Sequence, residues 1–270
     1  MTFLAATDFN GKKAFNFSVN AMMPDEYKDY AAFFRKFNGH APKIIIVGLD
    51  FFSTNGNFHG YEYSAPAEYF KNAEDPFWRY FTLLSLDSFS YSIRNIRQTI
   101  RPNKLNFYDR RLIKTAVVIP ESAKQNFVDK DLSMFKRDFY GNTYRYRDLR
   151  EVYGEFLSDN PYSRFIVFTT PDSLQLWKLL LKEGRLEDYL RWLGDIIEIF
   201  GEVYDFMGDN SFTSNSDNYM DGHHFYPQAG KIISNGIMSQ SFKSPGILVN
   251  KRNYPAHSSR IRSLYSDSKR

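Results

Sequence analysis

Three short apolar runs, separated by segments of helical period, constrain the fold of this chain more than any other feature. They are Lys43–Val47, Arg164–Thr169 and Glu202–Phe206. Continuous apolar runs rich in β-branched and aromatic residues are typical of strands that are buried on both faces. Apolar residues at helical spacing occupy Asp25–Phe37, Ser173–Lys182, Leu186–Phe200 and Pro227–Met238. The alternation predicts an α/β fold, a three-layer sandwich with a parallel sheet.

Residues 53–160 interrupt this rhythm. Phe77–Ile100 has helical period, whereas Lys104–Tyr153 is polar, basic and aromatic and shows no clear period. We interpret the interval as a helical and irregular insertion that caps the carboxyl edge of the sheet, where open α/β folds bind ligands. Residues 1–243 are therefore expected to form one α/β domain. Residues 244–270 are expected to form an irregular basic tail.

Composition narrows the classes of function. The 270 residues contain no cysteine, which excludes disulfides, thiolate metal sites and cysteine nucleophiles. The net charge of +4 is mild, and acidic residues are interleaved with the basic ones. Because no recognised nucleic-acid motif is present, nucleic acid is not an expected partner. No apolar stretch is long enough to span a bilayer, and the first residues lack the pattern of a signal peptide.

The segment 219–231 carries the strongest chemical signal. Asp221 and His224 are three positions apart, just before a predicted helix. In a tight turn this spacing lets a carboxylate hold one imidazole and fix its tautomer, as the base half of an Asp–His–Ser machinery requires. From spacing alone, a surface turn with an exposed histidine is an equal alternative. The neighbouring His223 must point elsewhere, toward packing or a substrate.

Two other interpretations of acidic residues are less favoured. A metal site made of Asp217, Asp221 and the two histidines is not expected, because adjacent histidines rarely face one ion. Asp205 and Asp209 form a carboxylate pair, but their spacing in a loop gives no reason to predict glycoside cleavage.

Three blocks of the chain resemble the SGNH (GDSL-like) hydrolases. Lys43–Phe52 is similar to their third block, a strand that ends in a Gly-x-Asn loop. Ala14–Val19 is similar to the second block, a strand followed by an oxyanion loop. Val203–Phe206 and Asn218–Phe225 resemble the last block, Asp-x-x-His. The blocks follow the family's order over most of the chain. The resemblance implies an SGNH-like, flavodoxin-like topology.

The resemblance also implies roles for single residues. Asp221 and His224 match the triad acid and base, and Asn16 lies in the oxyanion loop. Asp50 falls where the family has a side-chain amide. Because a carboxylate donates a hydrogen bond only when protonated, the oxyanion hole would be altered or built from backbone N–H groups. Trp78, within the predicted cap, is the candidate for stacking on a sugar.

In particular, the chain is similar to bacterial, membrane-tethered SGNH-like proteins of cell-envelope polysaccharide modification. Such relatives work outside the cytoplasm and carry an N-terminal membrane anchor. The resemblance therefore implies a serine esterase or O-acyltransferase, without a cofactor or a metal, whose substrate is an O-acylated, for example acetylated, glycan. Cell-envelope biosynthesis proteins are its implied partners. This sequence shows no export signal or anchor of its own.

The nucleophile block of the family is missing from the sequence. Fifteen residues precede Asn16, and none is a serine. Met1–Leu4 resembles the residues that follow the nucleophile in a Gly-Ser-Ser-Met-Thr loop. We therefore expect the chain to begin just after its nucleophile, to lack the first strand and to have little esterase activity. Ser18 and Ser53 are less favoured nucleophiles. The alternative function is a non-catalytic, SGNH-like glycan-binding or assembly protein.

Overall fold

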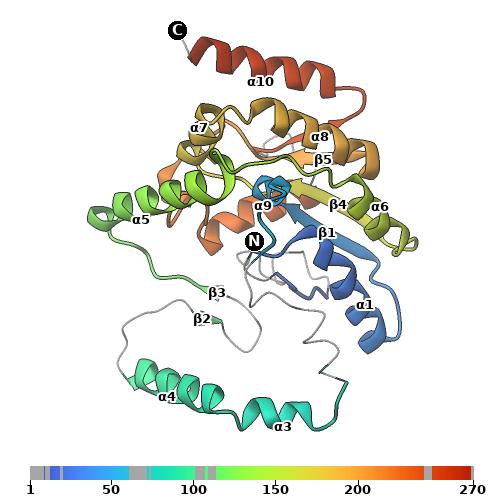
Figure 1. Ribbon diagram of the computed structural model, residues 1–270, viewed down its shortest axis with the longest axis vertical. Coiled ribbons are helices and arrows are strands. Elements are labelled where there is room, and N and C mark those ends of the chain that lie inside the picture. Colours follow the sequence, from blue (N-terminus) through green and yellow to red (C-terminus); the bar gives the residue numbers. More distant parts are fainter. Residues whose placement is uncertain are drawn as a thin grey trace.

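The computed structural model describes residues 9, 13–18, 21–60, 72, 74–100, 107–108, 114–239 and 245–268. An open sheet of four strands lies at its centre (Figure 1). The strands are β1 (Ile44–Leu49), β4 (Arg164–Thr169), β5 (Glu202–Asp205) and β6 (Ile247–Asn250), in the order β1-β4-β5-β6. The first three run parallel, and β6 runs antiparallel to β5. The protein is therefore an α/β protein with a mostly parallel sheet, and the three strands predicted from apolar runs are confirmed.

Side chains alternate across this sheet because successive residues of a strand face opposite sides. Val167 and Val203 point into one hydrophobic cluster, whereas Phe168 and Tyr204 point into another. Helices α1 (Tyr27–Asn38), α6 (Arg150–Ser158), α7 (Leu174–Lys182) and α8 (Leu186–Phe200) contribute to the first cluster, and α9 (Pro227–Ser239) contributes to the second. The sheet thus lies between two helical layers. The helices predicted beside the strands are all present.

Part of the interval without clear period is regular structure. Helix α5 spans Glu121–Met134, and a π-helix, η4, continues it over Phe135–Tyr140. Its period is hidden because two of the residues it buries, Lys124 and Asp131, are charged. Phe135 and Tyr140 belong to the main hydrophobic cluster. This part of the interval therefore belongs to the body of the protein.

The remaining elements are short or peripheral. Helices α3 (Trp78–Leu83) and α4 (Leu86–Ile100) stand apart from the sheet (Figure 1). The two-residue strands β2 (Phe107–Tyr108) and β3 (Lys114–Thr115) pair with each other. In the described residues, 3-10 turns lie at Pro24–Glu26 (η2), Phe51–Thr54 (η3) and Ser216–Asn218 (η5).

We expect the chain to lack the first strand of an SGNH-like sheet, and much of the segment that bears on this, residues 1–8 and 10–12, lies outside the described residues. Within the described chain, β1 has one sheet neighbour, β4. Residues 14–18, which we compared with a strand and an oxyanion loop, form no strand. Instead, Phe17 packs edge-on against Tyr30 and Phe34 of α1. The fold therefore gives these residues a packing role.

The prediction of an irregular tail is wrong. Residues 247–250 are strand β6, and α10 covers Tyr254–Ser268. His257 of α10 places Nε2 2.7 Å from an oxygen of Asp205, whose side chain is fully buried at the end of β5. The helix is hard to predict from the sequence because many of its residues are serine or arginine. Pro255, in its first turn, is nevertheless typical of a helix start.

We expect His257→Ala to destabilise the protein by about 3 kcal/mol, because it leaves Oδ2 of the buried Asp205 carboxylate without its hydrogen-bond partner. The measurement is the free energy of unfolding in urea. His40→Ala is the matched control, since His40 is exposed and contacts only the neighbouring carbonyl of Ala41 among its described bonds. Equal stability of the two variants would contradict a role for His257 in docking α10.

Candidate functional site

Polar side chains gather where the parallel strands end. Asp50 follows β1, and Asp172 follows β4 by three residues. The turn with the two histidines precedes α9 and lies against the same edge. In open α/β sheets, this carboxyl edge is where ligands bind. The arrangement therefore defines the candidate site of this protein.

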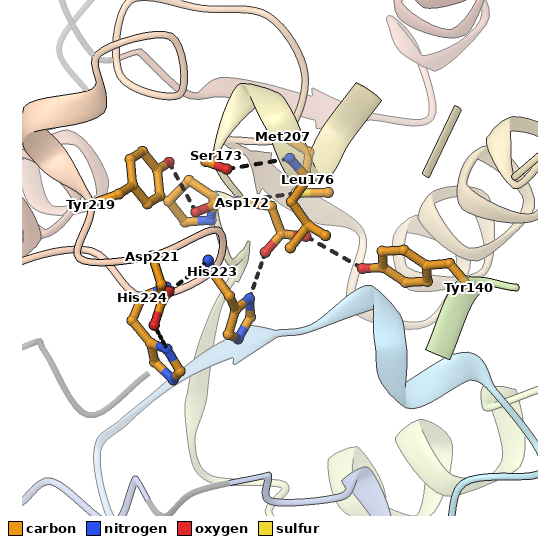
Figure 2. A network of polar contacts seen from close by, with 10 residues as sticks. Tyr140, Asp172, Ser173, Leu176, Met207, Tyr219, Asp221, His223 and His224 are labelled. Atoms are coloured by element: carbon orange, nitrogen blue, oxygen red, sulfur yellow. Dashed lines mark hydrogen bonds and ion pairs between the residues drawn. The ribbon is translucent and has the colours of Figure 1, made fainter. Parts of the chain in front are cut away.

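Asp221 organises the histidine turn. Its Oδ1 accepts the backbone N–H groups of His223 at 2.9 Å and His224 at 2.7 Å. Its Oδ2 lies 2.9 Å from Nδ1 of His224 (Figure 2). The predicted hydrogen bond between Asp221 and His224 is therefore present, and it engages Nδ1 of the imidazole. The catalytic role of the pair stays a prediction.

A second Asp–His pair lies beside the first, and sequence reasoning missed it. Nδ1 of His223 is 2.7 Å from Oδ1 of Asp172, and both side chains are buried (Figure 2). Tyr140 of η4 donates to the other carboxylate oxygen at 3.4 Å. The signal in the sequence was an acid just after a buried parallel strand. Nothing in the sequence indicates its partner, which is 51 residues away.

Two further hydrogen bonds join the loop after β4 to the histidine turn. The N–H of Ser173 donates to the carbonyl of Gly222 at 3.1 Å, and the hydroxyl of Tyr219 donates to the carbonyl of Pro171 at the same distance. Ser173 also caps α7 by accepting the N–H of Leu176. The loop after β4 and the histidine turn therefore form one unit.

The two imidazoles have opposite protonation behaviour. Burial opposes a charge on His223, but the hydrogen bond and the attraction of Asp172 outweigh burial and raise its pKa to about 9. Burial lowers the pKa of His224, and the positive charge of His223 adds to this effect, against the hydrogen bond from Asp221. The ring centres are 5.0 Å apart. At neutral pH, one ring is therefore charged and the other is a neutral base.

Asp131 of α5 is a fourth acid at the site, beside Asp50, Asp172 and Asp221. Its side chain is buried against Gly222, where an added Cβ would lie 2.8 Å from Oδ2 of Asp131. Only glycine permits this approach. Burial, reinforced by the negative charge of Asp221, raises the pKa of Asp131 to about 7. The Asp131 carboxyl, which keeps its proton up to about neutral pH, thus faces the histidine turn.

Unsatisfied oxygens mark the same region. In the described part of the chain, three buried side-chain atoms lack a hydrogen-bond partner: Oδ1 of Asp50, Oδ2 of Asp131 and Oγ1 of Thr170. Thr170 directly follows β4, and Asp50 is close enough for its charge to raise the pKa of His223. Buried polar groups without partners are rare, and at a functional site they await a ligand or water. All three belong to the carboxyl edge.

The other residues singled out in the sequence have different surroundings. Oδ1 of Asn16 accepts the N–H of Ser18 at 2.8 Å, within a segment that packs against α1. Ser53 is buried and donates to the carbonyl of Asp50 at 2.6 Å, so it is committed to the turn after β1. Trp78 lies in α3, apart from the sheet (Figure 1). The structure does not bring Trp78 to the site.

Neither a metal centre nor a membrane span emerges from the described residues. Among them, no group of three His, Asp or Glu side chains is arranged to hold a metal ion. No helix in the same part of the chain is both long and apolar enough to cross a bilayer.

Comparisons of the chain with models of protein families, with curated proteins and with solved structures returned no match. The class of the protein is therefore defined by its fold and its site: an α/β protein with a paired Asp–His site at the carboxyl edge of the sheet.

The Asp172–His223 pair makes stability depend on pH. The pKa of His223 rises from 6.5 to about 9 on folding, so the stabilisation is complete below the unfolded value and is lost as pH rises through about 9. We expect Asp172→Asn to be less stable at neutral pH and to lose this dependence. The measurement is the free energy of unfolding in urea at pH values from 6.5 to about 9. His224→Gln should keep the dependence; a flat wild-type profile would contradict the pairing.

Asp131 also makes stability fall as pH rises, but in a lower pH range and because burial disfavours its charged form. Its pKa rises from 3.8 to about 7 on folding, so the folded protein loses stability as pH rises between these values. We expect Asp131→Asn to be more stable than the wild type, by a margin that widens toward pH 8. Asp129→Asn, on the exposed face of the same helix, should show no such trend. Thermal unfolding over this range is the measurement, and a constant margin would refute the raised pKa.

Proposed function

We propose that Asp221 and His224 are the acid–base half of a serine esterase or O-acyltransferase. The observation that carries the proposal is the 2.9 Å hydrogen bond between them, in a turn that also fixes the carboxylate through two backbone N–H groups. A base held in this way keeps one tautomer and one orientation, which general-base catalysis requires. The low pKa of His224 supplies the neutral form of the base at pH 7.

In this proposal, Nε2 of His224 takes the proton of a serine hydroxyl as its oxygen attacks the carbonyl carbon of an ester. The carbonyl electrons move to the oxygen and then return, the bond to the sugar oxygen breaks, and the imidazolium protonates that oxygen. Asp221 stabilises the imidazolium in between. Water or an acceptor hydroxyl repeats the sequence on the acyl-enzyme. The charge of His223, 5.0 Å away between ring centres, favours the negative charge that develops on the carbonyl oxygen.

The sequence contains no Gly-x-Ser, so the proposal assigns the nucleophile to no residue of this chain. The resemblance to SGNH-like hydrolases supports a Gly-x-Ser loop after a further strand, next to β1 in an SGNH-like topology. It also supports an O-acylated, for example acetylated, cell-envelope glycan as the substrate. By the same resemblance, we propose an extracytoplasmic location and cell-envelope biosynthesis proteins as partners. The alternative function, glycan binding without turnover, agrees with the same geometry.

The test adds the missing parts to the chain. The 270-residue chain and a chain extended by a strand and a Gly-x-Ser loop are compared on acetylated model esters. We expect turnover in the extended chain only. His224→Ala and Asp221→Asn in the extended chain should lower kcat by at least about 10³-fold, since the base or its tautomer is lost. His40→Ala should leave kcat unchanged.

The pH profile of the extended chain adds a separate readout. Turnover should rise with pH through a pKa below 6.5, where His224 becomes neutral, and fall near pH 9, where His223 loses its charge. An extended chain that binds acetylated glycan but does not turn it over would favour the binding protein. Turnover by the 270-residue chain that is lost in Ser18→Ala would place the nucleophile within the present sequence.

A further inference from the structure

Helices α3 and α4 carry a dense exposed apolar surface. Ten of the eighteen large apolar side chains that are exposed in the described part of the chain lie within residues 77–100. Leu84, Leu86 and Ile100 are each exposed by more than 70%. Exposed apolar residues are ordinary when scattered, but a continuous group of this kind marks an interaction surface.

The apolar residues of α4 follow a single face. Leu86, Phe89, Ile93, Ile96 and Ile100 are separated by three and four residues in turn. In a helix, this spacing aligns side chains along one narrow stripe. Among the residues of α4 whose exposure the structure describes, none is buried, although α8, which has the same length, buries seven. The stripe is therefore an apolar face without a partner in the described chain.

Positive charge accompanies this face. Arg94 and Arg97 each follow an apolar residue of the stripe by one position and so lie along its flank. With Arg79 of α3 they outnumber the one acid of residues 77–100, Asp87, which leaves a net charge of +2. Guanidinium groups at the edge of an apolar stripe suit lipid phosphates, because their stems rest on the apolar surface while their heads stay in water.

Helix α3, which precedes α4 in the chain, is rich in aromatic residues. Trp78, Tyr80 and Phe81 lie on this short helix, and the last two are more than half exposed. Figure 1 shows α3 and α4 roughly end to end along one border of the molecule, away from the sheet. Trp and Tyr rings favour the boundary between water and lipid. A long, aromatic-rich border fits a planar interface better than a single partner helix.

We propose that α3 and α4 dock the protein on an anionic membrane surface. The apolar stripe enters the boundary between headgroups and acyl chains, and Arg79, Arg94 and Arg97 contact lipid phosphates. The helices lie in the plane of the surface and do not cross it. A second copy of the chain is the rival occupant, but symmetric pairing of the stripe would bring arginines of like charge to the same seam.

The test uses the full chain and two kinds of vesicle, of phosphatidylcholine alone and of phosphatidylcholine with phosphatidylglycerol. We expect cosedimentation with the anionic vesicles and a blue shift of tryptophan emission. Trp177 and Trp192 are already buried, so the shift reports Trp78. Phe89→Ser with Ile96→Ser should weaken binding at least about tenfold, since the apolar contribution is lost. Arg94→Gln with Arg97→Gln should remove the preference for anionic vesicles.

Tyr162→Ser is the matched control, because Tyr162 is 88% exposed in a turn before β4. Its binding should equal that of the wild type. Far-UV circular dichroism of every variant confirms that the helices remain. No binding of the wild type to either vesicle would overturn the proposal. So would a dimer in light scattering that Phe89→Ser with Ile96→Ser converts to monomer, because the stripe would then be a protein interface. Neither result bears on the histidine site.

Discussion

The buried bond between His223 and Asp172 is the contact on which the site depends. It joins the loop after β4 to the turn before α9, which are 51 residues apart in the chain, at a distance of 2.7 Å. Breaking it would leave a charged carboxylate inside the protein, a large cost in free energy. With Ser173 and Gly222 bonded beside it, the bond holds the histidine turn against the carboxyl edge of the sheet. The partly buried pair of Asp221 and His224 is positioned as a consequence.

Neighbouring histidines with different partners give this turn two electrostatic roles. His223 is deep and paired with a carboxylate from another element, so it keeps a proton at neutral pH. His224 is paired within the turn and is more exposed, and the charge next to it favours its neutral form. Asp131 adds a protonated acid on the other side of Gly222. A fixed charge, a base and an acid therefore lie within one small region, where their surroundings push their pKa values apart.

The spacing of residues along the sequence predicted much of the fold, but it predicted only the Asp221–His224 pair of the site. The strands β1, β4 and β5 and the helices α7 to α9 follow from apolar runs and helical spacing, which report burial directly. Asp221 and His224 were found because three positions of spacing suffice to form their bond. Helix α5 was missed because burial of charged groups obscures its period, and α10 was missed because its polar residues resemble a tail.

By itself, the sequence determined the alternation of strands and helices, the Asp–His turn and the apolar stripe of α4, because each depends on contacts between residues that are near in the chain. The tertiary structure alone decided that Asp172 meets His223, that Asp131 faces Gly222 and that His257 binds Asp205. Those contacts join residues far apart in the chain. Their energies come from burial, which lowers the local dielectric and turns an ordinary pair of side chains into a strong one. No local pattern encodes burial of that kind.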